Sequence, residues 1–128
     1  MKMNDISNCK PTIFIDQKKN RIRVFKSTLN MLGYPAFIQL LVNPESRNIA
    51  VRSALAEDVL AHRVRWKKLG DMQSYELYSS SLIHKIQTIC KDWEHGKSYR
   101  LLGSLYHSEN IAVSDLREAI LVQGNKEG

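Results

Sequence analysis

Residues 46–51 read S-R-N-I-A-V and residues 108–113 read S-E-N-I-A-V, so five of the six letters agree. In each place a short polar turn precedes the apolar triplet, which predicts a strand returning from a turn. A small β unit cannot bury its own apolar face, so pairing with a copy would complete a core shared by the Ile and Val side chains of both phrases. We interpret the two phrases as an internal duplication. The alternative is two unrelated hairpins that share a common triplet.

The residues around the first phrase predict a hairpin, a helix and a second hairpin. Residues 12–16 and 21–25 predict strands joined by a polar turn, because charged and apolar residues alternate in R-I-R-V-F. Ser27 or Thr28 would cap a short helix ending at Gly33, because a side-chain oxygen can accept an unpaired backbone N–H. Further strands are predicted over residues 37–42, 49–53 and 62–66.

The second phrase follows a similar order of elements. A strand over residues 75–78 precedes a run of serines that can cap a helix, and the helix carries Leu82 and Ile86 on one face. Residues 98–106 predict a strand in which Gly103 marks a bulge or a close approach of two backbones. The last predicted elements are a returning strand over residues 111–114 and a short helix over residues 115–122.

The net charge of +6 is unevenly distributed along the chain. Residues 1–70 contain 13 Lys and Arg against 5 Asp and Glu, whereas residues 71–128 contain 6 against 8. A basic segment is typical of proteins that bind a polyanion such as DNA or RNA. Ordinary surface lysines on a soluble protein are the alternative reading, and charge alone leaves both open.

Neither a membrane segment nor a secretion signal is predicted. No apolar run approaches the roughly 18 residues that a membrane-spanning helix needs, and no apolar segment follows the basic N-terminus as in a signal peptide. We therefore expect a cytoplasmic protein without membrane partners.

The sequence carries no pattern typical of a metal site, a cofactor site or an enzyme. Two cysteines, Cys9 and Cys90, and four scattered histidines do not form the paired spacings of a zinc site or a disulfide framework. The glycines are isolated, so no phosphate-binding loop is predicted. Asp92, Glu94 and His95 could perform acid–base chemistry, but we interpret them as the solvated end of a helix. We expect no metal, no cofactor and no enzymatic activity.

Residues 21–35, R-I-R-V-F-K-S-T-L-N-M-L-G-Y-P, resemble the swapped-hairpin module of the AbrB, SpoVT and MraZ transition-state regulators. The similarity covers residues 20–53 best and residues 74–116 more loosely, with Leu29 to Gly33 in the L-x-x-L-G position. It implies an α+β, β-rich fold in which two swapped-hairpin-like repeats form one intramolecular pseudo-twofold β-barrel with short helices. The implied division is an N-terminal arm and first strand in residues 1–20, a first repeat in 21–70 and a second repeat in 71–128, around one core.

The same resemblance implies a DNA-binding transcriptional regulator. Proteins of this family contact duplex DNA through basic residues on the N-terminal hairpin and beside the short helix. Carried over to this chain, these positions are Lys18, Lys19, Arg21, Arg23 and Lys26. Arg21 and Arg23 would share one face of a strand, as a phosphate-binding surface requires. Besides DNA, a homodimer is left open as a further partner state. The alternative is a protein-interaction or ligand-sensing domain on the same fold that has lost DNA binding.

A second basic segment, H-R-V-R-W-K-K at residues 62–68, interleaves cations with Trp66. Cations beside an aromatic ring are typical of nucleic-acid contacts, which combine charge with base stacking. On this reading Arg63 and Arg65 join the DNA-binding residues. The alternative is an edge strand that its charges protect from aggregation, with Val64 and Trp66 packed inward.

Overall fold

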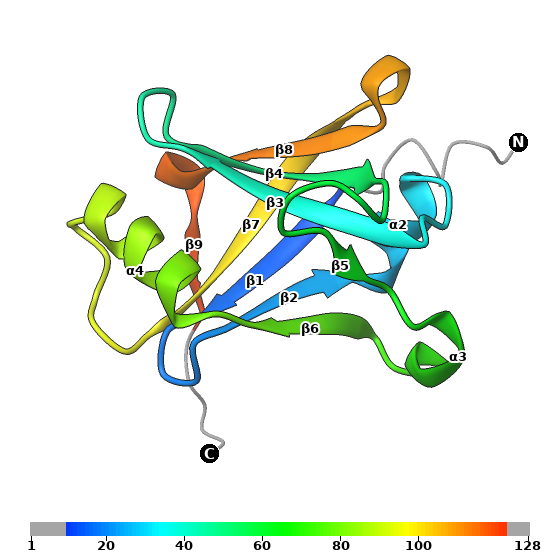
Figure 1. The fold of residues 1–128 in the computed structure, drawn as a ribbon. Coiled ribbons are helices and arrows are strands. Elements are labelled where there is room, and N and C mark those ends of the chain that lie inside the picture. The colour runs from blue at the N-terminus through cyan, green and yellow to red at the C-terminus, as the bar shows by residue number, and fades with distance from the viewer. Residues whose placement is uncertain (1–9, 123–128) are drawn as a thin grey trace, which may run out of the picture.

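One continuous, strongly curled antiparallel sheet dominates the computed structural model, which describes residues 10–122 (Figure 1). Its strand order is β5-β3-β4-β8-β7-β1-β2-β6, and β9 also pairs with β7. The strands are β1 (Thr12–Asp16), β2 (Arg21–Phe25), β3 (Phe37–Asn43), β4 (Asn48–Ala54), β5 (His62–Arg63), β6 (Ser74–Tyr78), β7 (Ser98–Tyr106), β8 (Ile111–Asp115) and β9 (Ile120–Val122). Within the described residues β5 and β6, at the two ends of this order, do not pair with each other. The sheet is therefore a half-barrel.

Short helices connect the strands, which confirms the predicted α+β, strand-rich class. They are the α-helices α2 (Lys26–Met31), α3 (Trp66–Leu69) and α4 (Ser80–Ile89) and the 3-10 helices η1 (His107–Glu109) and η2 (Leu116–Glu118). Figure 1 shows α4 across one end of the half-barrel and α2 near the other end. The helices thus cover the two openings that the curled sheet leaves.

Strand β7 joins two five-stranded parts of the sheet. Its first part pairs with β1 and with β9 and belongs to sheet A, whose order is β6-β2-β1-β7-β9. Its last part pairs with β8 and belongs to sheet B, whose order is β5-β3-β4-β8-β7. Gly103 stands at the change of sheet. A Cβ at this glycine would lie 2.5 Å from the Val113 carbonyl oxygen and 2.5 Å from the Ser114 Oγ. The predicted close approach at Gly103 is therefore confirmed.

Three hairpins share one loop design. Each loop has four residues, and the last of them adopts a left-handed backbone, with φ of 52° at Asn20, 56° at Arg47 and 54° at Asn110. In the first hairpin the Asp16 carboxylate accepts the backbone N–H groups of residues 18 and 19 at 3.1 and 3.2 Å. In the second hairpin Asn43 makes the same two contacts with residues 45 and 46. A short polar side chain at the end of a strand thus starts each of these two turns.

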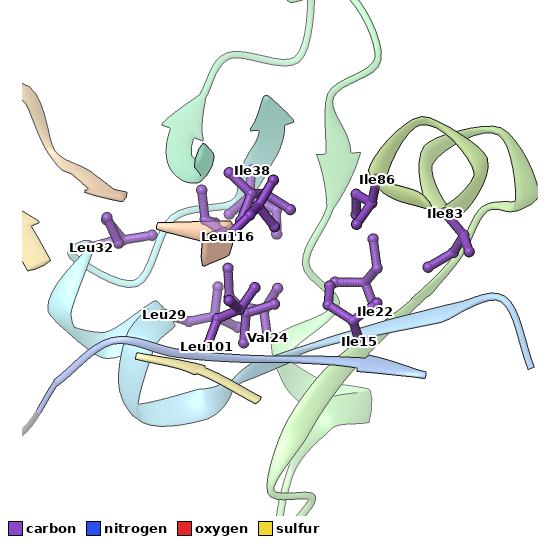
Figure 2. Close-up of a cluster of buried hydrophobic side chains, with 14 of the residues drawn as sticks. Ile15, Ile22, Val24, Leu29, Leu32, Ile38, Ile83, Ile86, Leu101 and Leu116 are labelled. Atoms are coloured by element: carbon purple, nitrogen blue, oxygen red, sulfur yellow. The ribbon is translucent and has the colours of Figure 1, made fainter. Parts of the chain in front are cut away.

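The core lies between the two sheets and the helices that cover their ends. Alternate residues of the strands point inward, so Ile15, Ile22 and Val24 are fully buried. Figure 2 shows Ile83 and Ile86 of α4 beside Ile15 and Ile22. Residues from both halves of the chain contribute to this single cluster.

The two copies of the repeated phrase lie side by side, because β4 pairs with β8. Ile49 and Val51 of the first copy are fully buried. In the second copy the inward residues are Ala112 and Ser114, which are opposite Val51 and Ile49. The expectation that Ile and Val of both copies face the core is wrong for the second copy. Its Ile follows directly after the hairpin loop, whereas Asn48 intervenes in the first copy, and a shift of one residue turns every side chain to the other face.

The helix caps follow the prediction at one helix only. Ser79 caps α4, since its hydroxyl accepts the backbone N–H of Leu82 at 3.1 Å. Helix α2 begins at Lys26 after Phe25 and has no side-chain cap. Thr28 is instead fully buried, and its hydroxyl accepts the backbone N–H of Thr12 at 2.8 Å. The predicted Ser27 or Thr28 cap is wrong because tertiary contact with β1 takes the hydroxyl.

Two predicted elements change type. Residues 62–66 form a strand only at His62–Arg63, and Trp66 begins α3. Within residues 115–122 only the three residues of the 3-10 helix η2 are helical, and β9, which pairs with β7, follows them. The strands β8 and β9 therefore follow one edge of β7 with η2 between them. Pairing with an available strand edge outweighs the local helical preference of this segment.

Candidate nucleic-acid interface

The outer face of sheet A carries two rows of side chains that run across its strands. Residues directly opposite each other in antiparallel pairs project from the same face. One row contains Glu76, Arg23, Phe14 and Arg100. The next row contains Tyr78, Arg21, Asp16 and Ser98. We call these two rows, with Lys18 and Lys19 of the β1–β2 turn and Lys97 before β7, the basic sheet face. A shallow depression of about 500 Å³ lies on it.

Arg21 is held by the two carboxylates of the basic sheet face. Its Nη2 donates to the Asp16 carboxylate at 2.8 Å, and its Nη1 donates to Glu76 at 3.4 Å. The Arg21 side chain is only 16% exposed. Burial lowers the pKa of Arg21, but hydrogen bonds to Asp16 and Tyr78 and the nearby carboxylate charges raise it above its ordinary value. Arg21 therefore serves first to neutralise Asp16 and Glu76.

Arg23 keeps more freedom than its neighbour. Its Nε donates to the Ser74 hydroxyl at 3.0 Å and lies 3.7 Å from the Glu76 carboxylate. The guanidinium carbon lies 5.8 Å from the centre of the Phe14 ring, within the range of a cation–π contact. One third of the side chain is exposed. Arg23 can therefore contact a ligand on this face while it stays anchored to β6.

Three lysines line the depression, and one further arginine lies on the same face beside Phe14. Lys18 and Lys19 are exposed on the β1–β2 turn, as the sequence predicted. Lys97 and Arg100 are also exposed, and sequence reasoning missed both. The sequence does contain a signal that Arg100 faces outward, because it alternates with the apolar residues Tyr99 and Leu101. Both of these neighbours are buried in the structure. What the sequence lacked was the pairing that sets β7 beside β1.

Lys26 lies apart from the basic sheet face. Its ammonium donates to the backbone carbonyl of Gly70, and its backbone N–H donates to Gln73. These contacts tie the start of α2 to the segment after α3. Lys26 is thus one of the predicted DNA-binding residues, but in the structure it links α2 to the segment after α3.

Arg63 and Arg65 line a second depression of about 200 Å³ beyond the edge strand β6. This depression also includes Ser74 and Glu76, the two residues that contact Arg23. Burial raises the pKa of Tyr75 in its wall, and the charge of Arg65 partly offsets this rise. The second depression therefore adjoins the basic sheet face, and six of the seven predicted residues border one continuous surface.

Trp66 packs away from the surface formed by the basic sheet face and the second depression. Its indole N–H donates to the Pro35 carbonyl at 2.8 Å, and its ring contacts Tyr34 with 5.4 Å between ring centres. Val64 is buried. The inward packing of residues 64 and 66 thus follows the alternative reading of this segment. The aromatic ring on the basic sheet face is Phe14, which the sequence reading did not select.

A cavity of about 350 Å³ lies at the end of α4, outside the basic sheet face. Its wall includes Cys90 and Trp93, and Trp93 stacks on Tyr99 with 4.1 Å between ring centres. Burial, with Asp92 nearby, raises the pKa of the Cys90 thiol to about 11. Asp92, Glu94 and His95 are exposed, and no cluster suited to a metal ion occurs among residues 10–122.

The raised pKa predicts an unreactive Cys90. A thiol with a raised pKa stays protonated up to a higher pH than an ordinary thiol. At about pH 8 the thiolate fraction of Cys90 is therefore roughly 100-fold smaller than that of a thiol with a pKa of about 9. In a Cys9→Ser protein, which removes the cysteine outside the described residues, we expect alkylation by iodoacetamide to be slowed by about one to two orders of magnitude. Unfolding in urea should restore the ordinary rate. Equal rates for folded and unfolded protein would contradict this reading.

No helix in the part of the chain that the structure describes is both long and apolar enough to cross a membrane. The chain matches no protein-family model, and neither a curated protein nor a solved structure shows significant similarity to it. The residues of the site therefore carry the functional argument.

Proposed function

We propose that this protein binds nucleic acid through the basic sheet face and acts as a non-enzymatic DNA-binding regulator of the AbrB-like kind. One observation carries the proposal. Lys18, Lys19, Arg23, Lys97 and Arg100 come from separate segments of the chain to one face. The two carboxylates on that face are already engaged with Arg21.

The charge balance of the basic sheet face favours a polyanion. Six cations stand there against the carboxylates of Asp16 and Glu76. Arg21 and Arg23 lie beside these two carboxylates and offset their charges. The four other cations, Lys18, Lys19, Lys97 and Arg100, therefore leave this face with a net positive charge among the described residues. Lysine and arginine side chains that neutralise phosphates release the cations condensed around the nucleic acid, and this release drives non-specific binding.

Binding should depend steeply on salt. If about four phosphates are contacted, affinity for labelled DNA should fall roughly 50- to 150-fold between about 50 and 200 mM salt. Lys97→Gln with Arg100→Gln should weaken binding and reduce the slope of log K against log salt by nearly two contacts. A matched control, Arg47→Gln with Lys85→Gln, removes two exposed charges outside the basic sheet face and should leave both quantities unchanged. Fluorescence anisotropy measures them.

Absence of binding at low salt would overturn this proposal. It would favour the second candidate, a protein-interaction or ligand-sensing domain on the same fold. A specific feature supports that candidate: Leu55, Val59 and Leu60 are between 62% and 78% exposed on one loop. Exposed apolar groups of this kind are typical of protein contacts, and a homodimer would be the simplest of them.

The duplication remains part of the proposal. Its support is the shared phrase and the antiparallel pairing of its two copies in β4 and β8. If the two phrases descend from one repeat, one copy has shifted by one residue relative to its turn, because the two Ile-Ala-Val triplets face opposite sides of the sheet. Two copies of a hairpin related in this way would explain why each half supplies strands to both sheets.

A further inference from the structure

Phe14 lies in the middle of the basic sheet face. It is directly opposite Arg23 on one side and Arg100 on the other. Its ring is partly exposed and lines the depression. An aromatic ring between two arginines offers a surface on which a base can stack, with guanidinium groups placed for the adjoining phosphates.

The architecture of sheet A does not suit groove reading of duplex DNA. A major groove about 12 Å wide admits an α-helix or a two-stranded ribbon. Here β1 and β2 are interior strands, flanked by β7 and β6. Four strands about 4.8 Å apart span about 14 Å between the outer strand axes alone. The β1–β2 hairpin therefore cannot enter a groove along its length.

Phe14 cannot stack on the bases of a duplex, because they are already stacked on one another. The bases of a single strand can turn outward and stack on an aromatic ring. The row of Arg100, Phe14 and Arg23 continues past Glu76 into the depression with Arg63 and Arg65. A flexible strand can follow this row across the sheet, but a rigid duplex can touch only part of it.

We propose that the basic sheet face binds single-stranded nucleic acid, with Phe14 as the stacking platform. The inference rests on the proposed nucleic-acid binding, and it replaces the duplex implied by the AbrB-like resemblance with a single strand. Arg23 and Arg100 are the cations beside the stacked base, and Lys18, Lys19 and Lys97 contact phosphates along the strand.

The test compares three labelled probes by fluorescence anisotropy at low salt: a dT oligonucleotide and an rU oligonucleotide of about 12 nucleotides, and a duplex of about 20 base pairs. We expect the better of the two single strands to bind at least about tenfold more tightly than the duplex. The DNA and RNA arms decide which strand is preferred, because only RNA offers a 2′-hydroxyl. Phe14→Leu should weaken single-strand binding about tenfold, the scale of one lost stacking contact. Its duplex affinity should change less than about twofold.

Two further variants separate stacking from folding. Phe14→Tyr keeps the ring and should retain single-strand affinity. Phe37→Leu removes a partly buried phenyl ring from β3 in sheet B and should have no effect on binding. If the duplex binds as tightly as both single strands and Phe14→Leu changes nothing, this inference is overturned while nucleic-acid binding stands. If none of the three probes binds, the proposed function fails and the inference with it.

Discussion

Gly103→Ala is expected to destabilise the fold by about 3 kcal/mol, near the upper end of the cost of overpacking. The added Cβ would lie 2.5 Å from the Val113 carbonyl oxygen and from Ser114 Oγ. The strand cannot easily move away, because the Gly103 N–H donates to the Pro11 carbonyl at 2.8 Å and residue 103 pairs with residue 114. Urea denaturation followed by circular dichroism measures the loss.

Two controls identify the cause of that loss. Ser104→Ala changes the exposed neighbour on the same strand and should alter stability by less than about 0.5 kcal/mol. Ser114→Ala removes a hydroxyl that is 2% exposed and has no hydrogen-bond partner among residues 10–122, so it should be neutral or stabilising. Added to Gly103→Ala, it should rescue only part of the loss, because the clash with the Val113 backbone remains. If Gly103→Ala were as stable as the wild type, β7 would not need the close approach at residue 103, and this prediction would be wrong.

Asp16→Ala is expected to cost about 2–4 kcal/mol. The Asp16 side chain is 9% exposed and accepts three hydrogen bonds, from two backbone N–H groups of the turn and from Arg21. Its removal leaves Arg21, whose side chain is 16% exposed, with Glu76 at 3.4 Å as its remaining ion-pair partner among residues 10–122. Breaking a buried pair from one side is costly because the other charge stays buried. The midpoint of urea denaturation and the thermal midpoint should both fall.

Asp16→Asn separates charge from turn geometry. It keeps an oxygen that can accept the two turn N–H groups and loses the charge opposite Arg21, so its cost should be about half that of Asp16→Ala. Asp115→Asn is the surface comparison, since the Arg117 side chain of that ion pair is 61% exposed. Its effect should be much smaller than that of Asp16→Asn, because solvent screens exposed pairs. Equal effects at the two sites would mean that Asp16 has no special structural role.

Much of the local structure could be predicted from the sequence. The β-rich run at residues 12–16 and the alternation in residues 21–25 predicted β1 and β2 with their bounds, and the serine run at residues 79–81 was recognised as the source of a helix cap. These features depend on neighbours within a few residues. The same reasoning failed for Thr28, which was expected to cap a helix. Its hydroxyl instead accepts a hydrogen bond from Thr12 of β1, 16 residues away.

The candidate site was predicted in part for the same reason. Lys18, Lys19 and Arg23 follow from one hairpin, which the sequence shows directly. Arg100 joins them only because β7 pairs with β1 across more than 80 residues. Arg21 looked equivalent to Arg23 by alternation, yet its charge is neutralised by Asp16 and by Glu76, which is 55 residues away in sequence.

The sequence by itself determined which residues of β2 face inward and where the β1–β2 hairpin turns, because the two-residue period and the turn residues act locally. Only the tertiary structure decided which strands are neighbours. That choice depends on burying apolar surface between segments far apart in the chain, as where Ile83 and Ile86 of α4 meet Ile15 and Ile22. The tertiary structure thereby brought Arg100 and Arg23 to either side of Phe14 and moved the second Ile-Ala-Val phrase out of phase with the first.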